Sequence, residues 1–246
     1  MREATLRDIE TFWRDLFGLA ADQLWRQATV QHPHSRLGAY EGWYVAWKAH
    51  GVHVSAPASA DADDVATLLA MSPSELQNPA FWQEFAHRRS LRVVGPAVHH
   101  YLDDDPGVPA DVEQVDPVRL TLLRNRATPQ EWEDSGVPEA LAAGGEALAV
   151  WGSTGDDERP WVPALLGGAV LTETAGARRD IGLLVAQDAR GGGVGFRLGQ
   201  AAASYAISWH GWARWTARTS NGPSLRLARR LGFEPYATAL ALKRAE

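Results

Sequence analysis

The stretch Ile181-Gly182-Leu183-Leu184-Val185-Ala186-Gln187-Asp188-Ala189-Arg190-Gly191-Gly192-Gly193-Val194-Gly195 decides the fold of this chain. Residues 181–185 are apolar apart from one glycine and predict a strand, and a helix is expected from about Val194 to Trp209. Four glycines in five residues suit neither element. Without Cβ atoms they allow a sharp turn and bring backbone N–H groups close to a ligand.

A strand, a glycine turn and a helix N-terminus together form a binding site for a phosphate or pyrophosphate, because the first helical N–H groups lack intrahelical partners. The spacing narrows the class of ligand. A P-loop requires a lysine that is absent here. A dinucleotide-binding motif requires the pattern G-x-G-x-x-G. Neither possible register fits, because the position of the third glycine is occupied by Phe196 in one and by Leu198 in the other. The pattern that fits is Arg-x-x-Gly-x-Gly, formed by Arg190, Gly193 and Gly195.

This pattern resembles the pyrophosphate-binding motif Q/R-x-x-G-x-G/A of the GCN5-related N-acetyltransferase (GNAT) superfamily, which follows a strand ending in a valine-like residue. A second segment, Asn221 to Phe233, resembles the helix N-x-x-A/S-x-x-L-Y-x-K-x-G-F of the same family. The residues agree with a helix there, since Asn221 is a good N-cap, Pro223 suits the first turn and Gly232 suits the left-handed position after the end. The resemblance covers residues from about 117 to 246.

The resemblance implies an α/β class (an α+β mixed sheet), with an acyl-CoA N-acyltransferase fold in the C-terminal half. It implies acetyl-CoA as co-substrate and transfer of its acetyl group to a primary amine by direct attack. The alternative is a non-catalytic acyl-CoA-binding or interaction protein on the same fold, suggested by Ala228, which stands where the family often has a tyrosine acid. The residues expected to bind acetyl-CoA are Leu183, Leu184, Val185, Arg190, Gly191, Gly192, Gly193, Val194, Gly195, Asn221 and Ser224.

Three residues are candidates for proton transfer. Glu173 and Asp180 are placed near the ends of neighbouring predicted strands, where either carboxylate could take the proton of the attacking amine. Tyr236 is a candidate acid for the departing thiolate. Solvated carboxylates and core tyrosines are the more common roles of such residues.

An acidic, turn-rich segment, Asp103 to Pro109, is the best domain boundary. We expect an N-terminal α/β domain of unassigned role over residues 1–112, which could be a degenerate copy of the same fold, and an acetyltransferase domain over residues 113–246. The other expected helices cover 5–19, 61–71, 75–88 and 128–132, and the other expected strands cover 43–47, 52–54, 91–94, 118–123, 147–151, 164–172, 212–218 and 236–242.

The composition excludes several classes of protein. The 246 residues contain no cysteine, which excludes disulfides and cysteine-ligated zinc, and no metal is expected. The net charge of −6 argues against nucleic acid or anionic membranes as partners. No signal-peptide core or membrane span is evident, so we expect a cytoplasmic protein. The expected partner is a small-molecule or peptide amine, and a homodimer is an open alternative to a monomer.

Overall fold

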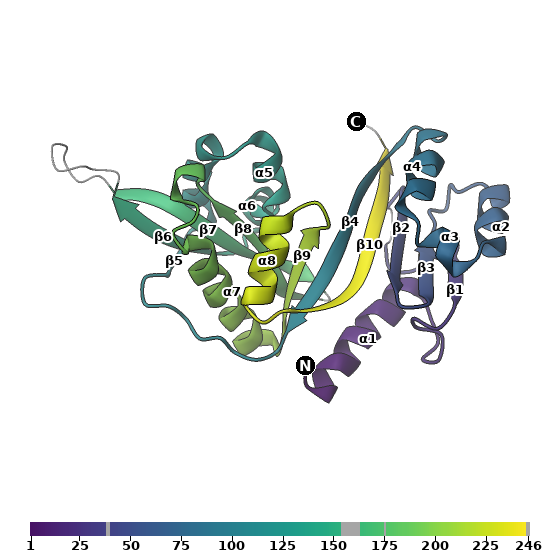
Figure 1. Cartoon of the computed structure of the whole chain (residues 1–246), viewed down its shortest axis with the longest axis horizontal. Helices are drawn as coiled ribbons and strands as arrows, with labels where there is room; N and C mark the ends of the chain where they lie inside the picture. Colours follow the sequence, from purple (N-terminus) through teal and green to yellow (C-terminus); the bar gives the residue numbers. More distant parts are fainter. Residues whose placement is uncertain (38–39, 154–162, 175, 245–246) are drawn as a thin grey trace. The chain divides into compact units, whose positions relative to one another are not determined.

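The computed structural model describes residues 1–37, 40–153, 163–174 and 176–244 (Figure 1). The chain forms two compact units. The N-terminal unit contains residues 2–99, 217–222 and 235–246, and the central unit contains residue 1, residues 100–216 and residues 223–234. Each unit is described by itself.

The N-terminal unit is built on strands that pair in the order β1-β3-β2-β10. The turn expected at His50-Gly51 joins β2 and β3, which are antiparallel with Val45 opposite Val54. Their apolar side chains pack with Trp82 and Leu68 into one core. The elements are α1 (Glu3–Phe17), β1 (Ala28–Gln31), β2 (Trp43–Lys48), β3 (Gly51–Ser55), α2 (Ala62–Ala70), α3 (Pro73–Leu76), α4 (Pro79–His87), β4 (Leu91–Leu102) and β10 (Glu234–Arg244).

Two predictions in this unit are wrong in detail. The single helix expected over residues 75–88 is two helices, because Asn78 caps a new helix with Pro79 in its first turn. The strand expected to end at Gly95 continues to Leu102. Proline removes one ladder donor, but the carbonyl oxygen of Pro96 still accepts a hydrogen bond from the Thr219 N–H at 2.9 Å.

The central unit has strands in the order β9-β8-β7-β6-β5. The β5–β6, β6–β7 and β7–β8 pairs are antiparallel, and β8 and β9 are parallel, as expected for strands connected through a helix. The elements are β5 (Glu113–Val115), η1 (Pro117–Arg126), α5 (Pro129–Asp134), α6 (Val137–Ala143), β6 (Glu146–Ser153), β7 (Pro163–Thr174), β8 (Ala177–Val185), η2 (Gln187–Ala189), α7 (Val194–His210), β9 (Ala213–Arg218) and α8 (Gly222–Arg230).

Helices cover both faces of this sheet (Figure 1). On one face, Leu184 of β8 and Val170 of β7 share a core with Trp132 and Val137 of α5 and α6. On the other face lies α7, where a Cβ on Gly199 would crowd Trp215 of β9 and Leu231 just after α8. Side chains along β8 alternate between these two faces, so every second side chain faces α5 and α6 and the others face α7.

The strand expected over residues 118–123 is wrong, because this segment is the 3₁₀ helix η1. Asp116 accepts a hydrogen bond from the Val118 N–H, with Pro117 in the first turn. Leu120 and Leu123, three residues apart, are fully buried, while Leu122 is 58% exposed. A period of three fits 3₁₀ geometry, whereas a strand would bury every second residue.

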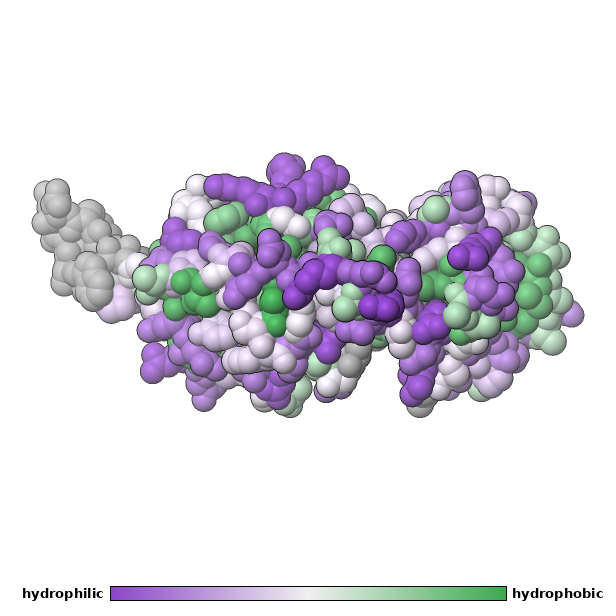
Figure 2. Space-filling model, turned by 90° about the horizontal axis from the view of Figure 1, so that it is seen from below, coloured by the Kyte–Doolittle hydropathy of each residue, from purple (hydrophilic) through white to green (hydrophobic). Residues whose placement is uncertain are grey.

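The compact units do not follow a single cut at residue 112. Strand β10 pairs antiparallel with β2, placing Leu240 opposite Val45, so the C-terminal residues belong to the N-terminal unit. The family boundary at residue 113 stays a prediction. In the described part of the chain, none of the helices has both the length and the apolar character needed to cross a bilayer. On the face drawn in Figure 2, hydrophilic residues predominate and hydrophobic residues are exposed in separate groups.

Candidate functional site

The glycine turn has the geometry that its composition predicts. Gly191 and Gly193 have φ angles of +84° and +79°, a region where other residues are strained. Gly193 is the N-cap of α7. The turn lies between the end of β8 at Val185 and the start of α7 at Val194.

Within the described part of the chain, the N-cap residue of α7 makes no side-chain hydrogen bond to the helix N-terminus. Gly193 has no side chain, and no acidic residue occupies the first turn of α7. By contrast, Asp61, Ser72 and Thr128 cap α2, α3 and α5 with their own oxygens. The N–H groups and the positive dipole end of this helix of 17 residues form a suitable position for an anion.

Arginines flank this turn. The Arg190 guanidinium donates to the Val185 carbonyl oxygen at 3.3 Å and pairs with Glu131 at 2.9 Å. Arg190 therefore ties the end of β8 to the turn, a role that the sequence did not indicate. Arg197, one turn into α7, donates to the Gly192 carbonyl oxygen and pairs with Asp111 at 2.8 Å.

The end of β8 lies directly against α7 and α8. A Cβ on Gly195 would be in contact with Val185 and Leu227 at 3.4 Å and with Leu183 at 3.8 Å. Leu183 and Val185 therefore face α7. The structure brings this expected pantetheine-binding strand and the expected phosphate-binding turn together.

Asp180 lies on the opposite face of β8. A Cβ on Gly182, two residues later, would clash with the Ser135 carbonyl oxygen, so this is the face covered by α5 and α6. A bulge places Thr172 opposite Asp180 and Glu173 opposite Arg178. The bulge leaves one extra residue on β8, and bulges of this kind re-aim side chains.

The Asp180 carboxylate is half-buried among polar groups of neighbouring strands. Its Oδ2 lies 3.8 Å from Arg214 Nε, and its Oδ1 accepts from the Thr216 hydroxyl at 3.4 Å. The Arg214 guanidinium also donates to the Thr174 hydroxyl at 3.0 Å. Burial raises the pKa of the Asp180 carboxyl above its ordinary value, and Arg214 partly offsets this.

The other two candidates for proton transfer do not join Asp180. Glu173 is exposed and, because strand residues alternate, faces away from its neighbours Thr172 and Thr174. Tyr236 belongs to the N-terminal unit, where its hydroxyl accepts from Trp25 Nε1 at 3.0 Å. Burial raises the pKa of Tyr236 to about 12, which makes it a poor acid at neutral pH.

The second motif forms the helix α8, as predicted. Gly232 follows it with a φ of +91°, and the Phe233 N–H donates to the Ala228 carbonyl oxygen. Ser224 accepts a hydrogen bond from Trp215 Nε1 at 3.0 Å, whereas Asn221 is exposed. The methyl group of Ala228 is fully buried, so this position supplies no proton donor.

Sequence patterns did not reveal every residue of this arrangement. Thr174, Arg214 and Thr216 reach Asp180 only because the bulge and the parallel β8–β9 pairing align them. Glu131 was foreseeable as part of a capping box with Thr128, but not as the partner of Arg190. Among the described residues, no cluster of three or more His, Cys, Asp or Glu side chains could hold a metal ion.

The mixed sheet, with its strand, glycine turn and helix followed by a parallel strand, is consistent with the acyl-CoA N-acyltransferase fold, and the predicted fold class is confirmed. The family model "Acetyltransferase (GNAT) family" matches residues 118–233. Residues 118–233 are thus similar to the GNAT family, whose members generally use acetyl-CoA as co-substrate in acetyl transfer. The match does not reach the N-terminal segment, where a degenerate copy stays a prediction.

Several solved structures are similar to this chain. A protein of Novosphingobium aromaticivorans, described as a GNAT-family acetyltransferase, is 15% identical over 64% of this chain and 69% of its own, with a TM-score of 0.47. A tandem GNAT protein from the clavulanic acid biosynthesis pathway is 20% identical over 69% of this chain, with a TM-score of 0.41. This chain spans 60% of that protein's length.

A Drosophila protein is 14% identical over 86% of this chain and 77% of its own, with a TM-score of 0.50. At this identity the likeness concerns the fold. No curated protein sequence matches the chain.

Proposed function

We propose that this protein is an N-acetyltransferase that transfers the acetyl group of acetyl-CoA to a primary amine of a small molecule or peptide. The observation that carries the proposal is the N-terminus of α7, formed by Gly191 and Gly193 directly after β8. An anion-binding site next to an open strand end suits a ligand with a pyrophosphate and a long thioester arm.

In this proposal each part of the β8–α7 segment has one role. The N–H groups around Gly193 hold the pyrophosphate, and Arg190 supports the turn through its hydrogen bond to the Val185 carbonyl oxygen. The backbone of residues 183–185 binds the pantetheine arm. An N–H group there also polarises the thioester carbonyl, in the manner of an oxyanion hole.

Asp180 is the proposed general base. An amine attacks only when neutral, so its proton must leave, directly or through a water, to a group whose pKa approaches the working pH. Burial raises the pKa of Asp180 in that direction, and no comparable burial applies to the exposed Glu173. As the C–N bond forms and the C–S bond breaks, the thiolate of CoA leaves without an assigned acid, since Ala228 offers none.

The test is an amine screen that measures release of free thiol from acetyl-CoA. The proposal predicts release that depends on both the amine and the enzyme, and acetylated amine in equal amount. Asp180→Asn should retain acetyl-CoA binding and lose most of the turnover. Thiol release without any amine would indicate a thioesterase instead.

The second candidate is a non-catalytic acyl-CoA-binding protein. The buried Ala228 at the position of the family's frequent tyrosine favours it. Both candidates predict acetyl-CoA binding that Gly193→Asp abolishes, but only the acetyltransferase predicts amine-dependent thiol release.

A further inference from the structure

Two glycines of the turn are loosely packed. Within the part of the chain that the structure describes, a Cβ on Gly191 would meet no atom within 4 Å, and one on Gly192 would meet the Ala189 carbonyl oxygen at 3.7 Å. Packing around these glycines therefore does little to fix the backbone N–H groups that the proposed function assigns to the pyrophosphate. Two ion pairs lie instead on the segment that directly precedes the turn, residues 186–190.

The first ion pair joins η1 to this segment. The Arg126 guanidinium, at the end of η1, donates to both carboxylate oxygens of Asp188 at 2.7 Å and to the Leu165 carbonyl oxygen of β7. Asp188 lies in η2, two residues before Arg190. A single guanidinium thus connects η1, strand β7 and the segment before the turn.

The second ion pair joins α5 to the turn. The Oε2 atom of Glu131 accepts hydrogen bonds from the N–H and the hydroxyl group of Thr128, at 2.9 and 3.0 Å, as part of the capping box of α5. Its Oε1 atom lies 2.9 Å from Arg190 Nη2. Because the capping box already orders this carboxylate, less side-chain freedom is lost when it pairs with Arg190 than in an ordinary surface ion pair.

Arg190 closes the segment on itself. Its Nε and Nη2 atoms both donate to the Val185 carbonyl oxygen at 3.3 Å, so the guanidinium is directed back toward the end of β8. The Ala189 N–H donates to the Ala186 carbonyl oxygen, and the Ala186 N–H donates to the Leu166 carbonyl oxygen of β7, both at 2.9 Å. The segment is therefore a compact loop that is attached to β7, η1 and α5.

We propose that these two ion pairs position the glycine turn for acetyl-CoA: they hold the segment before the turn, so that the N–H groups of the turn face the pyrophosphate. The inference rests on the proposed function, because it concerns the same anion site. It makes Arg190 a support of the turn and not a ligand of the pyrophosphate. It also makes Asp188 and Glu131 favourable for binding of an anion, although each carries a negative charge.

The sign of one measurement separates positioning from simple electrostatics. An acid near an anion site repels the anion, so replacing Asp188 or Glu131 with its amide should strengthen acetyl-CoA binding if charge alone decides. A direct contact of Arg190 with the pyrophosphate predicts the same sign for Glu131→Gln, which frees the guanidinium. Positioning predicts the opposite sign, because each amide keeps the shape of the side chain but loses the ion pair that holds the segment.

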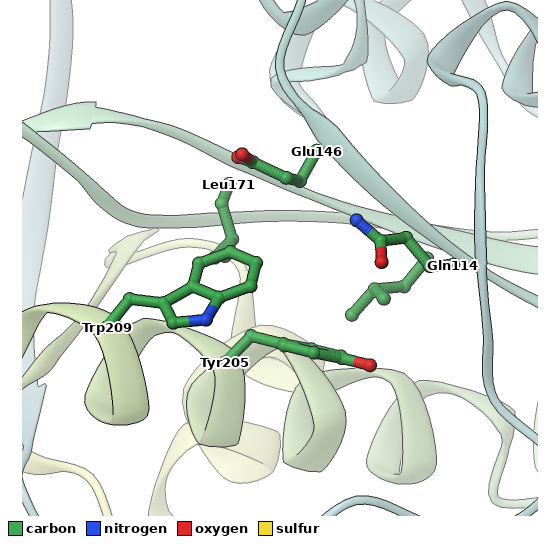
Figure 3. A pocket seen from close by; sticks show the side chains of 6 residues that line it. Gln114, Glu146, Leu171, Tyr205 and Trp209 are labelled. Carbon is green, nitrogen blue, oxygen red and sulfur yellow. The ribbon is translucent and has the colours of Figure 1, made fainter.

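Another ion pair of the same unit provides a matched control. The Glu146 carboxylate of β6 pairs with the Arg178 guanidinium of β8 at 2.8 Å, and both side chains are partly exposed, as in the pair between α5 and the turn. Figure 3 shows Glu146 beside Trp209, in the C-terminal half of α7, whereas the glycine turn lies at the N-terminus of that helix. Glu146→Gln therefore removes a similar ion pair that does not reach the turn.

The first experiment measures acetyl-CoA binding to the full chain by calorimetry, with urea unfolding in parallel. Glu131→Gln and Asp188→Asn should each raise the Kd of acetyl-CoA by about threefold, and the double variant should raise it by about tenfold or more. Glu146→Gln should leave the Kd unchanged. An unchanged or lower Kd in the folded double variant would overturn the positioning role and leave the acetyl-CoA site in place.

The second experiment is independent of acetyl-CoA. Hydrogen exchange of the unliganded protein reports local opening, and the Ala186 and Ala189 N–H groups should exchange faster in the double variant than in the parent or in Glu146→Gln. Unchanged exchange in the double variant would overturn the inference. Faster exchange in a protein whose parent does not bind acetyl-CoA would support the role of the ion pairs in holding the turn and would overturn the proposed function.

Discussion

The carboxylate of Asp180 on β8 lies 3.8 Å from the Arg214 guanidinium on β9, and these two residues are also the pair that aligns the two parallel strands. From Asp180, β8 continues to Val185, and the glycine turn follows. The ion pair places a half-buried carboxylate on the sheet face opposite α7. The buried surroundings raise the pKa of Asp180, which is the property a general base requires.

Replacing Asp180 with asparagine should lower kcat/KM by about 10²–10⁴-fold, the usual worth of a positioned base. The rate of the parent should rise with pH as Asp180 deprotonates, through a pKa above the ordinary value for aspartate. In Asp180→Asn this limb should disappear. Thiol-release kinetics across pH, with the acetyl-CoA Kd measured in parallel, check both points.

Glu173→Gln is the control for that measurement, because Glu173 is an exposed carboxylate on the same sheet. It should leave both the rate and its pH dependence unchanged. A larger loss in Glu173→Gln than in Asp180→Asn would reverse the assignment of the base.

Ser224→Ala should act on stability more than on binding. Its hydroxyl accepts a hydrogen bond from Nε1 of Trp215, which is 3% exposed, and removing the acceptor leaves a buried donor unpaired. We expect a loss of about 1–3 kcal/mol in the free energy of unfolding, measured by urea denaturation. A normal stability together with a large loss of acetyl-CoA affinity would instead make Ser224 a direct ligand.

The stability of the protein should fall in mild acid because of His53. Its ring is fully buried, Nε2 accepts from the Trp25 N–H at 3.0 Å, and burial lowers the pKa to about 4. The unfolded chain, with a histidine pKa of about 6.5, binds the proton more tightly. Stability is therefore fully present above about pH 6.5 and decreases as the pH falls toward 4, by up to about 3 kcal/mol.

His53→Asn should be less stable at neutral pH but should show a flatter dependence of stability on pH between these values. The measurement is urea unfolding at a series of pH values. An equally steep dependence in the variant would assign the effect to other groups, such as His34, whose pKa burial also lowers.

The parts of the site that could be predicted from the sequence are those where the residue type determines the backbone conformation. The glycines at 191 and 193 require positive φ angles, and Gly232 ends α8 in the same conformation. Capping and spacing therefore located β8, α7 and α8 correctly. The family match at residues 118–233 agrees with this part of the interpretation.

The features that could not be predicted from the sequence depend on contacts between residues that are far apart in the chain. The burial of Leu120 and Leu123 made residues 117–126 a 3₁₀ helix although their composition suits a strand. No pattern in the neighbouring sequence indicates the bulge at Glu173 or the pairing of β10 with β2. The grouping of Thr174, Arg214 and Thr216 around Asp180 follows from register, which sequence spacing alone does not specify.

The most direct test of the account is a calorimetric titration of acetyl-CoA into the parent and Gly193→Asp, with Gly144→Asp as the matched control. Gly144 also has a positive φ, of +69°, but ends α6, where an added Cβ would meet no atom within 4 Å. We predict micromolar binding by the parent and Gly144→Asp, and a loss of about 100-fold or more in Gly193→Asp, whose carboxylate occupies and repels the anion site. Equal binding by folded Gly193→Asp, or none by the parent, would contradict the assignment of the glycine turn as the acetyl-CoA site.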